Sequence, residues 1–198
     1  MSKSKQKTKE VILNLTIPLF AKYGYDKVSM RQIAEAVGIK AASLYHHFPN
    51  KQALYIAALT ETFSKHAAFM NESFTLQASP EQRLGRLVHQ LCILMNENTD
   101  FSRLIQREIM DGNEKRMQFL ADHVFGDFFF DMNKLCLAFA PERDPHLMTI
   151  SILGLVIYHF QLSPIRSFLP GFQASHNDLE VVAMHVVSLL IPSGEYEE

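Results

Sequence analysis

The chain has 198 residues, of which 47% are hydrophobic and 20% are charged. This composition is that of an ordinary globular protein and excludes a disordered chain, while the length suffices for one or two domains with a sizeable core. The net charge of −2 conceals a division, because residues 1–51 carry a net charge of +6 and the remainder carries −8. A basic segment before an acidic remainder indicates that this segment alone binds a polyanion. The alternative is that the basic segment is only an exposed lysine tail.

Neither a secretory signal nor a membrane span is visible. The most apolar stretch, Met148–Leu162, is shorter than the roughly 20 residues that a bilayer requires. Cys92 and Cys136 lie within apolar helical patterns, which is typical of buried, reduced thiols. We therefore expect a cytoplasmic protein with no membrane partner.

No pattern in the sequence points to catalysis or metal binding. His46 and His47 are adjacent, so they point in different directions on a helix, and the other histidines show no paired metal-ligand spacing. A glycine-rich phosphate loop and a nucleophile elbow are both missing. We therefore expect no catalytic residue, no metal site, no cofactor and no enzymatic activity.

The chain opens with a basic arm and a first helix, predicted over Thr8–Tyr23. Ser29 and Gln32 then have the spacing of a capping box, which predicts a second helix over Met30–Val37, and Gly38 follows where a left-handed residue closes a helix. A third helix runs until Pro49, because the residue before a proline avoids helical angles. Two short helices joined by a glycine-containing turn are typical of the helix-turn-helix, whose second helix enters the major groove of DNA.

The segment from about Val11 to Leu59 resembles the tetracycline-repressor (TetR) family of transcriptional regulators. The resemblance lies in the run Gly38 to Phe48, followed by Asn50, Lys51, Ala53 and Leu54, and in the upstream residues Phe20, Gly24, Tyr25, Ser29, Arg31, Ile33 and Ala34. It implies an all-α protein with a helix-turn-helix DNA-binding domain over residues 1–50. It also implies a helical regulatory and dimerisation domain over residues 51–198.

Helical periodicity continues through the rest of the chain, and no alternating strand pattern competes with it. We expect about nine or ten helices in all. Those after the helix-turn-helix are predicted over Asn50 to about Ser73, from the capping box of Ser79 and Gln82 onward, over Phe101–Met110, over Glu114 to about Phe139, from Asp144 through Phe160, and from a cap at Asn177 and Glu180 to Pro192.

The DNA contacts are expected on the second and third helices and at the start of the fourth. The resemblance assigns Tyr45 and Lys51 to phosphates, with Ser29, Arg31 and His46 beside them. Candidates for reading base edges are Lys40, Ala41, Ala42 and Ser43, because lysine and serine can donate hydrogen bonds and alanine can contact thymine methyl groups. For Tyr45 a packing role is the alternative.

The resemblance also implies a cavity for a small-molecule effector in the regulatory domain. Candidate lining residues are Phe63, Met70, Phe125, Phe128 and Phe129, with Arg103, Arg107 or His159 meeting a polar group. The alternative is that the phenylalanines belong to the core and that the two arginines pair with Glu108 or Asp111. The two very apolar C-terminal helices correspond to a four-helix dimer interface in the resembled family.

Two functions follow as hypotheses. The first is a homodimeric, ligand-responsive transcriptional repressor that binds a palindromic double-stranded operator, with activation as a variant of the same function. The second is an all-helical small-molecule carrier or enzyme whose basic N-terminus merely packs. A steep loss of DNA affinity with added salt distinguishes the first from the second.

Overall fold

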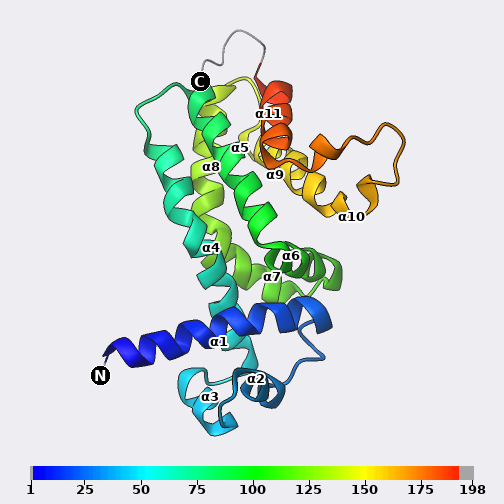
Figure 1. The fold of residues 1–198 in the computed structure, drawn as a ribbon. Helices are drawn as coiled ribbons and strands as arrows, with labels where there is room; N and C mark the ends of the chain where they lie inside the picture. Colours follow the sequence, from blue (N-terminus) through cyan, green and yellow to red (C-terminus); the bar gives the residue numbers. More distant parts are fainter. Residues whose placement is uncertain (1, 192–198) are drawn as a thin grey trace. The chain divides into compact units, whose positions relative to one another are not determined.

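The structure is a computed structural model that describes residues 2–191, with side chains described for residues 9–64 and 70–191 (Figure 1). Every regular element of the described chain is a helix and none is a strand, as predicted. The helices are α1 (Ser2–Tyr23), α2 (Met30–Val37), α3 (Ala41–His47), α4 (Lys51–Thr75), α5 (Pro80–Glu97), α6 (Thr99–Asp111), α7 (Glu114–Leu120), a π-helical turn η1 (Ala121–Phe125), α8 (Gly126–Phe139), α9 (Pro145–Gln161), α10 (Ser163–Arg166), a 3-10 turn η2 (Ala174–Asn177) and α11 (Leu179–Leu190).

These helices form two compact units. The first unit comprises Met1–Lys65 and Asp100–Val124, and the second comprises His66–Thr99 and Phe125–Glu198. The chain therefore passes between them three times, once within α4. The sequence-based division at residue 50 does not coincide with this one, because α6 and α7 join the first unit although they follow α5 in the sequence.

The core of the first unit is built around aromatic rings at the end of α1. Phe20 is fully buried and its ring lies 5.7 Å from that of Tyr25 and 4.9 Å from that of Tyr55. The apolar stripes of α2 and α3 add Ile33 and Leu44, both with no exposed surface. This packing fixes the helix-turn-helix on α1 and on the first half of α4.

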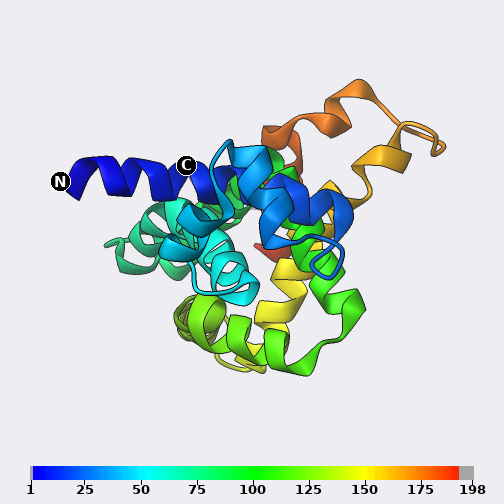
Figure 2. The ribbon, with the colours of Figure 1, turned by 90° about the horizontal axis from the view of Figure 1, so that it is seen from below.

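In the second unit α5 packs against α8, α9 and α11. The buried faces of these four helices include Leu87, Met132, Ile152 and Val186, all fully buried. Between α9 and α11 the chain passes through α10, which contacts α9, and η2, which contacts α11, and the segment between α10 and η2 projects outward in two views (Figure 1, Figure 2). Arg166 holds this segment, since its guanidinium donates to the carbonyls of His159 and His176.

Three predicted boundaries need correction. The first helix begins at Ser2 rather than Thr8, because the lysines and glutamine of the arm are good helix formers. The last helix is capped by Asp178, whose carboxylate accepts the N–H of Glu180 over 2.9 Å, and Asn177 instead ends η2.

The continuous α-helix predicted over Glu114 to Phe139 is also wrong, since residues 121–125 form a π-helical turn. At this turn the imidazole of His123 stacks on Phe119 at 3.9 Å and its Nδ1 lies 3.1 Å from the Phe119 carbonyl oxygen. The side chain thus competes for the carbonyl that an α-helix would offer to the His123 N–H. Gly126, a weak helix former, follows directly.

None of the described helices combines the length and the apolar character that a bilayer-crossing helix requires.

Candidate nucleic-acid interface

Helix α2 is held at both ends by its own sequence, as predicted. The Ser29 hydroxyl accepts the N–H of Gln32 over 3.3 Å, and the Gln32 side chain accepts the N–H of Ser29 over 2.8 Å. At the other end Gly38 adopts φ +76°, and the N–H of Ile39 reaches the Ala34 carbonyl over 2.9 Å. This left-handed closure turns the chain sharply toward α3.

Helix α3 buries one residue and leaves most of its surface exposed. Leu44 is completely buried against the first unit, whereas the side chain of Tyr45 is 52% exposed. The helix ends at His47, because Pro49 holds Phe48 in an extended conformation at φ −136°. The predicted contact residues Lys40, Ala42, Ser43 and His46 are exposed and Ala41 is half-buried.

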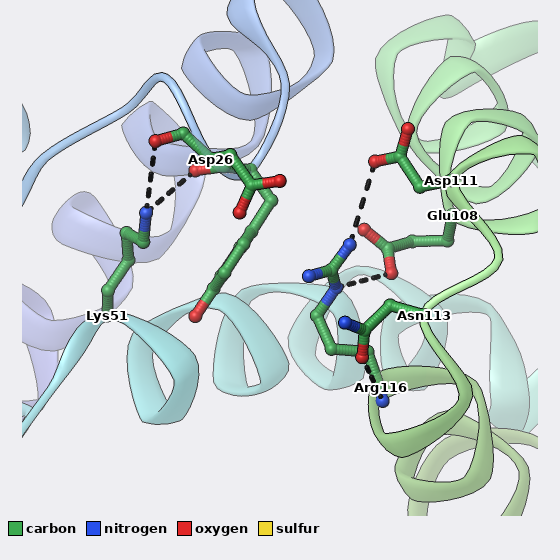
Figure 3. A network of polar contacts seen from close by, with 7 residues as sticks. Asp26, Lys51, Glu108, Asp111, Asn113 and Arg116 are labelled. Atoms are coloured by element: carbon green, nitrogen blue, oxygen red, sulfur yellow. Dashed lines mark hydrogen bonds and ion pairs between the residues drawn. The ribbon is translucent and has the colours of Figure 1, made fainter.

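The start of α4 combines a cap with a lysine. The Asn50 side-chain oxygen accepts the N–H of Ala53 over 2.8 Å, which leaves other N–H groups of the first turn without helical partners. The ammonium of Lys51 donates to the carbonyl of Tyr25 over 2.9 Å and lies 3.5 Å from that of Asp26 (Figure 3). An ammonium has three donors, so one is left for an outside anion.

The predicted DNA-contact residues thus all lie in the first unit, on α2, α3 and their flanking turns or at the first residue of α4. Ser29 and Arg31 are exposed at the start of α2. Ser29 is bonded to Gln32, as the capping box predicts. The partners of Lys51, the carbonyls of Tyr25 and Asp26, were not predicted from the sequence. The contact role of these nine residues stays a prediction.

Behind Lys51 lies a buried ion pair that sequence reasoning missed. Arg116 Nε donates to Glu108 Oε2 over 2.8 Å, and Arg116 Nη2 lies 3.6 Å from Asp111 Oδ2 (Figure 3). Burial lowers the pKa of Arg116, but its hydrogen bond to Glu108 and the nearby negative charges outweigh this and hold the pKa above its usual value. The one signal in the sequence was the turn around Gly112, which reverses the chain and brings the end of α6 to the start of α7.

The Tyr25 ring lies between these two groups of charges. Lys51 Nζ is 4.3 Å and Arg116 Cζ is 4.6 Å from its centroid, both within the range of cation–π attraction. Burial raises the pKa of the Tyr25 phenol above its ordinary value, so the side chain is neutral at physiological pH.

The candidate pocket residues are divided between the two units. In the first unit Phe63 stacks on Phe101 at 6.4 Å, and Arg103 is exposed and pairs with Asp100 at 3.3 Å. The alternative partners for the arginines, Glu108 and Asp111, are instead occupied by Arg116. Arg107 is exposed, and its guanidinium lies near the backbone of Gly24.

In the second unit the ring of Phe128 contacts that of Phe129 at 6.1 Å, and Met70 is buried. His159 meets His185 edge to face at 5.5 Å, and Phe125 is half-buried. Among the candidates of the second unit, Phe128 and Phe129 are thus in ring contact. A surface depression of about 460 Å³ belongs to the first unit and contains none of the candidates; its lining residues are Tyr23, Lys27, Gln32, Glu35 and Ala36.

Comparison with known proteins places the strongest likeness on the helix-turn-helix. Residues 12–58 match the model of a family described as bacterial regulatory proteins, tetR family. The HTH-type transcriptional repressor KstR of Mycobacterium tuberculosis is 33% identical over 97 residues, which are 49% of this chain and 44% of KstR. The chain thus spans about half the length of the curated relatives it matches.

Solved structures extend the likeness in fold over nearly the whole chain. The transcriptional regulator FadR from Bacillus subtilis, solved with stearoyl-CoA, superposes with a TM-score of 0.76 at 17% identity, covering 94% of this chain and 99% of FadR. AibR, solved with isovaleryl coenzyme A and operator DNA, superposes with a TM-score of 0.72 at 21% identity, covering 93% and 98%. At such identities the likeness concerns the fold.

Proposed function

We propose that this chain, whose residues 12–58 match the model of the tetR family of bacterial regulatory proteins, is a sequence-specific regulator of transcription that binds double-stranded DNA. The observation that carries the proposal is the surface of α3. Only Leu44 of this helix is buried, while the polar side is presented to solvent between a capped α2 and Lys51. A helix that served packing alone would bury more of its surface.

In the proposed complex α3 enters the major groove. Tyr45, Lys51, Ser29, Arg31 and His46 contact phosphates, which set the register but carry no sequence information. Lys40, Ala41, Ala42 and Ser43 face base edges. With few hydrogen-bonding groups among these four, the shape of the DNA supplies part of the specificity. Acting on bacterial DNA, the protein would work in the cytoplasm.

We propose that a second copy of the chain covers α9 and α11. These helices leave large apolar side chains on the surface of the second unit, among them Leu147 (66% exposed), Tyr158 (63%), Met184 (58%) and Leu189 (58%). Apolar patches of this kind mark interaction surfaces. A twofold dimer would read two half-sites about 34–36 Å apart. Sedimentation showing only monomer at micromolar concentration would remove this part of the proposal.

The effector we propose to test first is an acyl thioester of coenzyme A. Two proteins that share this fold were solved with such thioesters, stearoyl-CoA and isovaleryl coenzyme A. The candidate pocket residues Phe63, Met70, Phe125, Phe128, Phe129, Arg103, Arg107 and His159 stay proposals for this ligand. Release of DNA by acyl thioesters, with free coenzyme A as the control, tests the class.

The decisive experiment is selection of binding sites from a randomised duplex pool, followed by titration of the selected site at several salt concentrations. For a protein that contacts six to ten phosphates, affinity falls by about 10³ to 10⁵ between 50 and 200 mM salt. Enrichment of a palindrome with a steep salt dependence supports the proposal. Indifference to every duplex at low ionic strength favours the second candidate, a helical small-molecule carrier or enzyme. Repression and activation are then separated by the position of the site relative to a promoter.

A further inference from the structure

Tyr25 lies on the turn between α1 and α2, a segment that would be a passive connection in a simple helix-turn-helix. Gly24, at φ +81°, ends α1 and turns the chain so that the Tyr25 ring packs into the first unit. There the ring contacts Phe20 at 5.7 Å and Tyr55 at 4.9 Å. The ring is therefore held by the core while part of the residue stays at the surface.

Two cations share this one ring. Lys51 Nζ and Arg116 Cζ lie 4.3 and 4.6 Å from the ring centroid. The positive charges of Lys51 and Arg116 repel each other, and this repulsion is offset because each cation also contacts oxygen atoms. Lys51 is held by the carbonyls of Tyr25 and Asp26, and Arg116 by carboxylates.

Arg116 is held on its side of the ring by hydrogen bonds. Its guanidinium bonds Glu108 at 2.8 Å, and its backbone N–H donates to the Asn113 side chain over 3.0 Å (Figure 3). The Arg116 and Glu108 side chains are only 10% and 3% exposed. A buried pair of this kind has a defined geometry, because any displacement leaves an uncompensated charge.

We propose that Tyr25 is a positioning residue for DNA binding: its ring and carbonyl hold the Lys51 ammonium at the start of α4, and the buried Glu108–Arg116 pair holds the ring. The inference rests on the proposed function, since Lys51 is a proposed phosphate contact. A free lysine side chain must be ordered when it binds a phosphate, and a lysine that is already ordered avoids this loss. Helices α6 and α7 thereby influence a DNA contact that neither of them makes.

The first test compares Tyr25→Phe with Tyr25→Leu on a mixed-sequence duplex, because a phosphate contact needs no particular sequence. The phenylalanine keeps the ring face and should bind within about twofold of the parent chain. The leucine should bind about three- to tenfold more weakly. Phe130→Leu is the matched control. The ammonium of Lys134 lies 4.0 Å from the centroid of the Phe130 ring in the second unit, and loss of this cation–π contact should leave DNA affinity unchanged.

A double-mutant cycle separates positioning from general damage. In a Lys51→Ala background, Tyr25→Leu should cost nothing further, because the residue that it positions is gone. Lys51→Ala should reduce the slope of log K against log salt by about 0.9, the value for one phosphate. Tyr25→Leu should reduce the slope in the same direction, which a merely structural change that preserves the contact would not do.

The second link is tested with Arg116→Lys, which keeps the charge but loses the planar guanidinium. Affinity should fall with the Tyr25 ring present and should not fall further in Tyr25→Leu. Should Arg116→Lys fail to fold, Asp111→Asn replaces it, because this substitution removes only the exposed partner of Arg116. The expected changes in affinity, with and without the Tyr25 ring, are the same.

The outcomes are distinct. Parent protein that binds DNA, with Tyr25→Leu of equal affinity and equal salt slope, overturns the inference and leaves the proposed function standing. Additive losses from Tyr25→Leu and Lys51→Ala overturn it as well. Parent protein that binds no duplex removes the proposed function and this inference together.

Discussion

Arg116 Nε donates a hydrogen bond to Glu108 Oε2 over 2.8 Å, and both side chains are almost completely withdrawn from solvent. The pair joins the last turn of α6 to the first turn of α7 within the first unit. Its stability therefore affects the unit that carries the helix-turn-helix.

We expect Glu108→Gln to lower the free energy of unfolding by about 3 kcal/mol, because it leaves a buried guanidinium with one partly exposed carboxylate as its compensation. Denaturant unfolding measures the change. Lys134→Ala is the control, since its ion pair with Asp131 is exposed and should contribute less than about 1 kcal/mol. Equal effects of the two substitutions would contradict the assignment.

The DNA-contact residues should separate into two classes. Tyr45→Ala or Lys51→Ala should weaken binding to all sequences, because each removes a proposed phosphate contact. Lys40→Ala or Ser43→Ala should change the preferred sequence, by about 1–3 kcal/mol at the base pair concerned. Binding of the four variants to a randomised duplex pool measures both effects, and equal behaviour of all four would be evidence against α3 as the reading helix.

Two serines with the same capping geometry provide a matched pair. Ser29 and Ser79 each cap a helix with a glutamine three residues on, so Ser29→Ala and Ser79→Ala should each lower stability by about 1 kcal/mol. Only Ser29→Ala should also lower DNA affinity, since Ser29 is exposed at the start of α2. If both variants bind DNA as the parent does, Ser29 is a cap and not a phosphate contact.

Both thiols should be inert in the folded protein. Burial, and to a smaller extent the charge of Glu180, raise the pKa of Cys92 to about 12, and burial also raises the pKa of Cys136. Neither should react with an aromatic disulfide reagent at pH 8, and both should react after unfolding. The unfolded chain ionises the Cys92 thiol with a pKa of 9.0, whereas the folded chain keeps it neutral. The contribution of the buried thiol to the free energy of unfolding is therefore present below pH 9.0 and is lost as the pH rises above that value. Rapid labelling of native protein would reopen a redox role.

The second unit should lose stability in acid through His159. Burial, followed by the charges of Arg166 and His185, lowers the pKa of this imidazole below 6.5. The neutral form is therefore favoured in the folded state, and its contribution is present above pH 6.5 and lost as the pH falls through the lowered value. Unfolding from pH 8 to pH 5 measures the loss. His159→Gln should flatten that dependence, whereas the exposed His146→Gln should not.

The sequence by itself determined the helical class, the capped α2, the glycine closure at residue 38 and the polar surface of α3. These features depend on interactions within three or four residues along the chain, which spacing alone reveals. Residues 12–58 match the model of the family that the same segment resembles. The sequence-based predictions were wrong at the cap of α11 and at the π-helical turn, where neighbouring side chains compete for the same backbone groups.

Only the tertiary structure decided that residues 100–124 join the unit containing residues 1–65, and that Tyr25 meets both Lys51 and Arg116. Which helices pack together depends on the shapes and charges of surfaces that lie far apart in the sequence, and no local period encodes them. The Glu108–Arg116 pair is of this kind, because its two members lie on separate helices and face each other only after Gly112 has reversed the chain.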